Sequence, residues 1–226
     1  MLGQRIFAPV MSSRVFLLNL IACLWCCIVL AVRFHIAGHH YYTFMLWNLF
    51  LAGIPLGLSL GLPRINRLIL ALPLLAVWLL FFPNAPYVLT DLIHLNEHNG
   101  HVPKWLDLLM LLSFAFVALW FGFQSLHIVQ HWFARKFSHT IAWCVTIGSL
   151  GLSGFGVYLG RFLRWNSWDI LRRPEVLLGD IASRFLDPLS HLRTWGFTLG
   201  FGTLLILAYL IWFSAATTAQ NSRNPD

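Results

Sequence analysis

Charged residues are scarce in this chain, and acidic residues are the scarcest of them. Only 10% of its 226 residues are Asp, Glu, Lys or Arg, and eight of these are acidic, whereas 58% of the chain is hydrophobic. A typical soluble domain carries about 25% charged residues, so the composition excludes an ordinary soluble domain. We therefore expect the chain to lie in a membrane.

Cysteine is also scarce, and its spacing matches neither a zinc site nor a disulfide framework. The four cysteines lie in apolar stretches, where we expect them to behave as small hydrophobic side chains: Cys23, Cys26, Cys27 and Cys144. Leu20–Cys23 resembles a lipoprotein cleavage box, but the apolar run continues to Val32, which disfavours lipidation. That run has no A-x-A site and ends at Arg33, so we expect a retained helix. No motif predicts a cofactor.

Basic residues outnumber acidic ones by 15 to 8, which gives a formal net charge of +7. Nucleic-acid binding needs a solvent-facing basic surface with stacking aromatic residues, and the sequence shows none, so we expect no nucleic-acid partner. The basic residues divide almost equally between alternate loops. Short loops near helix ends decide orientation, and they hold Arg64, Arg67 and Arg135. We therefore expect both termini in the cytoplasm and the spans in the inner or plasma membrane.

Six apolar blocks are long enough, or nearly so, to cross a membrane as helices. The blocks are Val15–Val32, Phe44–Leu62, Leu68–Phe82, Trp105–Ile128, Ile141–Leu163 and Thr194–Phe213. The sequence predicts an all-α, polytopic membrane helix bundle that forms a single integral membrane domain over residues 1–226. We find no internal repeat, which disfavours a secondary transporter because such folds are usually built from repeats.

Small residues recur along three of these blocks. Membrane helices approach one another closely where small residues line a face. The glycines concerned are Gly53, Gly57 and Gly61 in the second block, Gly148, Gly151, Gly154, Gly156 and Gly160 in the fifth, and Gly196 and Gly200 in the sixth. We expect these faces to pack helices within one bundle. A homo-oligomer through a glycine-rich face is the alternative.

The third block ends in an unusual stretch, FFPNAPYVLTDLIHL (residues 81–95). The apolar run before it, Leu68–Phe82, covers only about 22 Å of a hydrocarbon core roughly 30 Å thick. Pro83 removes a backbone donor, and Asn84 is placed to cap a new helix over Ala85–Leu95. We expect this short helix to lie at the membrane interface or to re-enter the membrane.

Polar residues in this stretch and in a later loop predict a polar centre. Tyr87, Asp91 and His94 would share one helical face, followed by His98. The later loop begins GVYLGRFLRWNSWDIL (residues 156–171), where Tyr158, Arg161, Trp165 and Asp169 would share a face. Arginine at the end of an apolar span needs headgroups or an acid, so we predict that Asp91 meets Arg161 or Arg164. The candidate residues are Asn84, Tyr87, Asp91, His94, Tyr158, Arg161, Arg164, Asn166 and Asp169.

These two stretches, with WNLFLAGIPL (residues 47–56), resemble the bacterial integral membrane family called domain of unknown function 1361. The likeness runs from about Trp47 to Ile181. It implies a polytopic bacterial membrane protein. It implies no activity, and no catalytic residue carries over from the family.

The polar centre leaves three functions open. Arg161 and Arg164 beside tryptophans suit an anionic lipid headgroup or a lipid-linked phosphate, which would make membrane lipid the partner. The same residues could instead form an Asp–Arg network that only locks the helices of a structural or assembly protein. In the third case Asp91 and His94 would act as an acid–base pair in an enzyme on a lipid-linked substrate, although no nucleophile is evident.

A metal site and a channel are both disfavoured. Asp91, His94 and His98 could supply three metal ligands, but the surrounding NEHNGHVP resembles a solvated loop, so we predict no metal. A stripe of polar residues in the fourth block is expected to face the bundle interior: Gln124, His127, Gln130 and His131. Such groups on a single helix argue against a channel.

Overall fold

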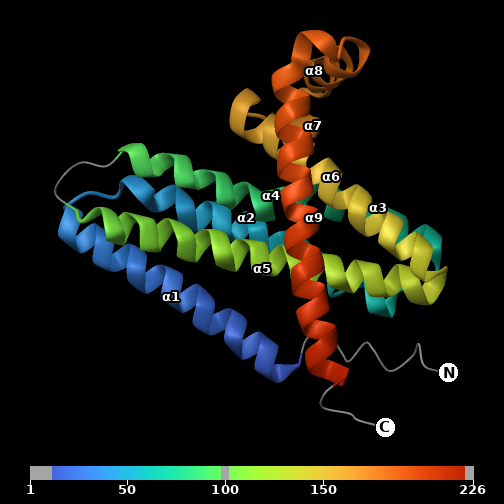
Figure 1. The fold of residues 1–226 in the computed structure, drawn as a ribbon, viewed down its shortest axis with the longest axis horizontal. Helices are drawn as coiled ribbons and strands as arrows, with labels where there is room; N and C mark the ends of the chain where they lie inside the picture. Colours follow the sequence, from blue (N-terminus) through green and yellow to red (C-terminus); the bar gives the residue numbers. More distant parts are fainter. Residues whose placement is uncertain (1–11, 98–101, 222–226) are drawn as a thin grey trace. The chain divides into compact units, whose positions relative to one another are not determined.

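Every regular element in the described part of the chain, residues 12–97 and 102–221 of a computed structural model, is a helix (Figure 1). The long helices are α1 (Ser13–Ala37), α2 (Phe44–Ser59), α3 (Leu68–Phe81), α5 (Lys104–Lys136), α6 (His139–Leu163) and α9 (Leu192–Asn221). The short ones are α4 (Asn84–Tyr87), α7 (Asp169–Arg172), α8 (Pro174–Leu186) and the 3-10 helices Tyr41–Thr43, Leu62–Arg64, Val88–Glu97 and Leu189–His191. The predicted all-α class is confirmed.

Six helical stretches in the described residues are long and apolar enough to cross a membrane. They are Ser13–Ala37, Tyr41–Arg64, Leu68–Leu95, Lys104–Lys136, His139–Leu163 and Leu189–Thr218. Each apolar block predicted from the sequence lies inside one of them, so the expected six-span architecture is confirmed. The helices extend beyond the blocks because polar residues continue the same hydrogen-bonded backbone. Helix α5 is therefore about 50 Å long, more than a hydrocarbon core requires.

The described residues form two compact units, residues 12–129 and residues 130–221, whose boundary lies within α5. The first unit contains α1 to α4 and most of α5. The second contains the end of α5 and α6 to α9. The single integral domain expected from the sequence stays a prediction.

The unit of residues 12–129 has an apolar core to which α1, α2, α4 and α5 contribute. Cys26 of α1, Met45 of α2 and Phe114 of α5 are completely buried in it. Helix α1 begins where the Ser12 hydroxyl accepts a hydrogen bond from the N–H of Val15, the usual role of an N-terminal cap. It ends at Gly38, whose φ of 69° lies in the left-handed region that favours glycine.

The segment after α3 is helical as predicted, but its form differs. One turn of α-helix, α4, continues as the 3-10 helix Val88–Glu97 instead of an α-helix over residues 85–95. The expectation that Asn84 caps this helix is wrong, because its Nδ2 donates to the carbonyl of Phe81 at 2.8 Å. A cap at position 84 would have bonded the N–H of residue 86 or 87. Pro86 has no N–H, and the Tyr87 N–H already donates to Pro83.

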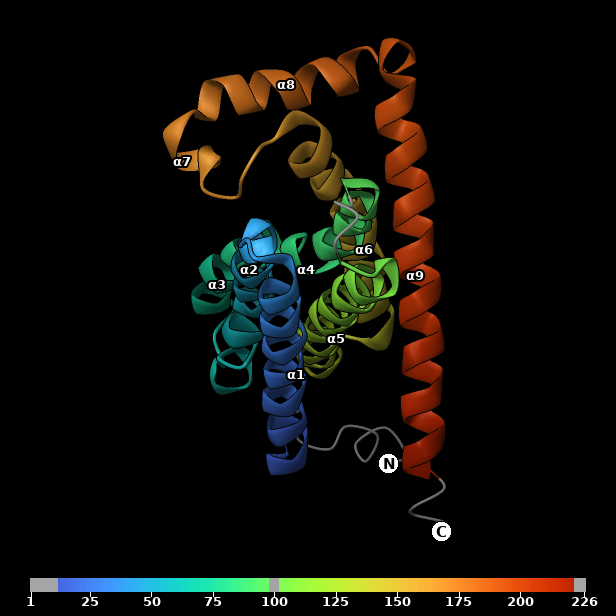
Figure 2. The ribbon, with the colours of Figure 1, turned by 90° about the vertical axis from the view of Figure 1, so that its left-hand side faces the viewer.

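In the unit of residues 130–221, α6 packs along α9, and α8 lies across the end of α9 (Figure 2). The closest approach is at Gly154 of α6. A Cβ added there would lie 2.6 Å from the carbonyl oxygen of Thr198 and 3.0 Å from the backbone nitrogen of Gly202. The predicted role of small residues in helix packing is thus found at Gly154. Among the described atoms nothing lies within 4 Å of a Cβ built at Gly53 or Gly57.

We predict that Gly154→Ala destabilises the protein by about 1–3 kcal/mol, because the methyl group forces two backbones apart. Unfolding of the detergent-solubilised protein by heat or by denaturing detergent measures this effect. Gly148→Ala is the matched control on the same helix, since a Cβ there meets no described atom within 4 Å. Equal stabilities of the two variants would contradict the prediction.

Candidate functional site

Asp91 is buried and ties the 3-10 helix that follows α4 to α2. Asp91 is 1% exposed, and its Oδ2 accepts a hydrogen bond from Nδ2 of Asn48 at 2.8 Å. On the same helix, the carbonyl of His94 accepts a hydrogen bond from the hydroxyl of Tyr42 at 3.0 Å. The ring of His94 packs against Phe44, with their centroids 5.0 Å apart. These contacts give Asp91 and His94 structural roles in their own unit.

The helical face predicted for Tyr87, Asp91 and His94 is only partly correct. A 3-10 helix has three residues per turn, so Val88, Asp91 and His94 align while Tyr87 lies to one side. Val88 and Asp91 are both buried, which agrees with this register. Tyr87 is half-buried, and its carbonyl accepts a hydrogen bond from the Thr90 hydroxyl at 2.6 Å.

Arg33 and Asp107 form a buried ion pair that the sequence analysis missed. Nε of Arg33 lies 3.1 Å from Oδ1 of Asp107, and the two residues are 2% and 0% exposed. The guanidinium also lies 4.5 Å from the ring centroid of Tyr42 and 3.3 Å from Nδ1 of His39. Arg33 was expected only to close the first span. The sequence feature that could have predicted this pair is that Arg33 lies near the end of α1 and Asp107 in the first turn of α5.

Polar side chains within the spans bond to one another. The side chains of Asn19 and Gln124 exchange two hydrogen bonds of 3.2 and 3.0 Å, and Nε1 of Trp120 donates to Oδ1 of Asn19 at 2.9 Å. In the other unit, the Tyr209 hydroxyl donates to Oε1 of Gln130 at 2.7 Å. Gln124 and Gln130 therefore lie in the interior, as the predicted polar stripe requires. They join helices.

The face predicted for Tyr158, Arg161, Trp165 and Asp169 does not exist. Helix α6 ends at Leu163, and the next residue leaves the helical path, so positions 165 and 169 follow a different course. Tyr158 is buried in an aromatic cluster, its ring centroid 5.0 Å from that of Phe162. Arg161 is half-buried.

Asn166 and Asp169 belong to the turn that begins α7. Oδ2 of Asp169 accepts hydrogen bonds from the backbone N–H of Asn166 at 2.8 Å and from its Nδ2 at 3.4 Å. Asp169 is buried, and the Asn166 side chain is exposed. The carboxylate of Asp169 thus shapes its own loop.

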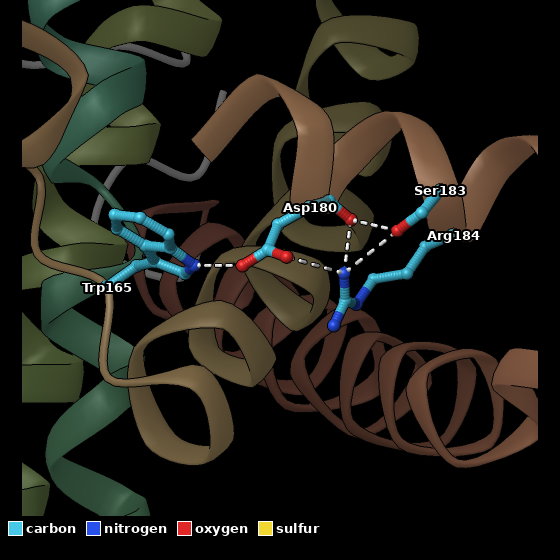
Figure 3. Close-up of polar contacts among 4 residues, drawn as sticks. All are labelled: Trp165, Asp180, Ser183 and Arg184. Atoms are coloured by element: carbon cyan, nitrogen blue, oxygen red, sulfur yellow. Dashed lines mark hydrogen bonds and ion pairs between the residues drawn. The ribbon is translucent and has the colours of Figure 1, made fainter. Parts of the chain in front are cut away.

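A cluster of four residues holds α8 in place (Figure 3). Nε1 of Trp165 donates to Oδ2 of Asp180 at 2.8 Å. Nη1 of Arg184 lies 3.7 Å from Oδ1 of Asp180, donates to the Asp180 carbonyl and lies 3.4 Å from the Ser183 hydroxyl. The Arg184 carbonyl accepts a hydrogen bond from Nε1 of Trp195 at the start of α9. The cluster fixes which face of α8 points inward, and the sequence analysis did not single it out.

Four arginines remain exposed around this cluster: Arg164, Arg172, Arg173 and Arg193. Two of them lie over aromatic rings, and these contacts restrict the positions of their guanidinium groups. The guanidinium carbon of Arg173 is 5.3 Å from the centroid of Trp165, and that of Arg193 is 4.6 Å from the centroid of Phe162.

Exposed acidic residues balance only part of this positive charge. Asp169 and Asp180 are committed to the contacts just described, which leaves Glu175 and Asp187 as exposed acids in the connection between α6 and α9. The hydroxyl and backbone N–H of Ser190 hold the pKa of the Asp187 carboxyl below its ordinary value, so this group is ionised at neutral pH. The connection and the first turn of α9 together thus expose four arginines and two acids.

The described residues contain no group of three His, Cys, Asp or Glu side chains arranged to hold a metal ion. His98, the third residue of the weak metal alternative, lies outside the described residues. The predicted pairing of Asp91 with Arg161 or Arg164 concerns residues of different units and stays a prediction.

The six apolar helical spans define a multi-pass helical membrane protein. The profile of the family described as "Protein of unknown function (DUF1361)" matches residues 47–208, more than two thirds of the chain. The chain belongs to this family, which confirms the resemblance seen in the sequence. No curated protein and no solved structure matches the chain.

We predict that Arg33→Met destabilises the protein by about 3–5 kcal/mol, because the substitution leaves Asp107 charged and buried without its cation. The double variant Arg33→Met with Asp107→Leu is expected to recover most of that loss. Unfolding in detergent measures both, with Arg67→Met, which removes an exposed arginine, as a nearly neutral control. A double variant as unstable as Arg33→Met would contradict the prediction, because the loss of stability would then not come from an unpaired Asp107.

Proposed function

We propose that this protein recognises an anionic lipid phosphate, either a phospholipid headgroup or a lipid-linked phosphate, through the exposed arginines that follow α6. The proposal places the site at Arg164, Arg172 and Arg173, with Arg161 and Arg193 beside it. Arginine suits phosphate because its planar guanidinium donates two parallel hydrogen bonds.

The observation that supports this proposal best is the backbone of Arg164. Its φ of 60° makes it the one non-glycine residue with positive φ among the described residues. It forms the C-terminal cap of α6, where glycine is usual, and an L side chain there costs about 1–2 kcal/mol. An exposed arginine kept in a strained cap at the end of a membrane span favours a role for its side chain.

The surroundings of Arg164 suit a headgroup. The apolar span of α6 ends at Leu163, one residue before it, and Trp165 follows it. Tryptophan is enriched where a membrane span meets the headgroup layer. We further propose that the membrane is the bacterial inner membrane with both termini cytoplasmic, because short basic loops favour that side.

A purely structural role is the second candidate. It is favoured by the hydrogen bonds of Asp91 to Asn48 and of Asp169 to Asn166, which use these two carboxylates inside their own units. In this alternative the arginines only anchor the protein among headgroups, without preference for a particular lipid.

Arg164→Gly distinguishes lipid recognition from a purely structural role. If the side chain binds lipid, the variant should be more stable but should bind the lipid more weakly. Glycine relieves the left-handed strain, so we expect unfolding in detergent to require about 1 kcal/mol more. Loss of one charge-assisted contact should weaken retention of phosphatidylglycerol roughly tenfold. Native mass spectrometry of protein extracted from vesicles of phosphatidylglycerol and phosphatidylcholine measures the retained lipid.

Arg67→Gln is the control, since it removes an exposed arginine from a different loop. It should leave phosphatidylglycerol retention unchanged. A stabilised Arg164→Gly variant that retains this lipid as well as the unaltered protein would overturn the proposed function and leave the structural role.

A further inference from the structure

The connection between α6 and α9 exposes large apolar side chains although it lies outside both spans. Leu171 is 86% exposed, Leu186 85% and Leu178 58%. The flanking apolar spans cover residues 139–163 and 189–218, so these leucines belong to neither. Leucines this exposed in a connecting segment mark an interaction surface.

The pattern along α8 shows how this surface is arranged. Leu177 and Arg184 are seven residues apart, share one face and are both buried. Leu178, Ala182 and Phe185 follow one another at four and three residues and form an adjacent exposed stripe. We call these three residues the α8 stripe. The hydrogen bonds from Trp165 to Asp180 and from Trp195 to the Arg184 carbonyl hold the buried face inward, so the α8 stripe is kept from rotating into the protein (Figure 3).

Charge lies at the start of α8 as well. Arg172 and Arg173 precede the helix and are exposed, and Arg173 lies over Trp165. Helices that lie on a membrane surface combine an apolar face with arginine or lysine that reaches anionic headgroups, and tryptophan favours the same depth. The long stems of arginine let its charge stay at the phosphates while the backbone lies deeper.

We propose that α7 and α8 lie on the surface of the same bilayer that α6 and α9 span, with the α8 stripe and Leu171 inserted at the headgroup boundary of a leaflet containing anionic phospholipid. Helix α9 begins close after α8 and crosses the membrane, which keeps α8 near the bilayer surface (Figure 2). Helix α8 runs across the end of α9, the orientation that a surface-lying helix needs.

This inference does not depend on the proposed function. It rests on exposed apolar side chains with Arg172 and Arg173 beside them, and would hold even if Arg164 bound no particular lipid. Conversely, Arg164→Gly is expected to leave the insertion of α8 unchanged, so the two proposals can fail separately.

Photo-crosslinking tests the insertion directly in the full chain. We would replace Leu178 by p-benzoylphenylalanine, reconstitute the protein in vesicles of phosphatidylglycerol and phosphatidylcholine, and irradiate. Position 176 is the matched control, because Val176 is 57% exposed and lies about 160° away round the helix from position 178. Intact-protein mass spectrometry should show phospholipid adducts at position 178 at several times the yield at position 176, with phosphatidylglycerol adducts in excess.

Two results of this experiment would overturn the inference. One is a covalent dimer at position 178 on a denaturing gel, which would assign the surface to a second copy of the chain. The other is a yield of lipid adducts at position 178 no greater than at the control position, which would show that the α8 stripe is not the inserted side.

A second measurement avoids the bulky probe. Leu171→Asn with Leu178→Asn should make amide hydrogen exchange of residues 174–186 several times faster in the same vesicles, while the peptides of α6 remain unchanged. Val176→Asn is the control, about 160° round α8 from position 178, and should leave exchange unaltered. Unchanged exchange in the double variant would overturn the inference.

Discussion

A polar group buried in a chain that lies in lipid has to find its partner within the protein, because hydrocarbon offers none. Several buried polar side chains of this protein meet that constraint across helices. Arg33 pairs with Asp107, and Nε1 of Trp78 donates to the hydroxyl of Ser125 at 2.6 Å. Each such bond joins residues far apart in sequence and defines how one helix sits against another. Leucine cannot do this in lipid, because its environment is equally apolar on every side.

The same constraint divides the polar residues of the chain into two groups. Asp91 and Asp169 accept hydrogen bonds from Asn48 and Asn166 of their own units, which offset the cost of burying these carboxylates. The exposed arginines between α6 and α9 are different, because they lie at the end of a membrane span with fewer exposed acids beside them. That connection brings arginine, tryptophan and exposed leucine together.

The spans could be predicted because span formation depends on local composition: about 20 apolar residues form a helix in lipid wherever they occur. Helix form beyond the spans could not be predicted so easily. Asn84 has the chemistry of a cap, yet Pro86 has no N–H and that of Tyr87 is already bonded to Pro83. The end of α6 could not be predicted either. Arg164 adopts the left-handed conformation there, and arginine is not a residue type that favours it.

The sequence by itself determined that this is an all-helical, six-span membrane protein of the DUF1361 family, because hydropathy and motif are properties of contiguous residues. Tertiary structure alone decided the partners of the polar side chains. No local pattern pairs Arg33 with Asp107, or Trp165 with Asp180, since each bond needs two segments brought together by packing. It also decided which face of α8 is buried, because a helix with apolar residues on several sides can be oriented only by the contacts that hold it.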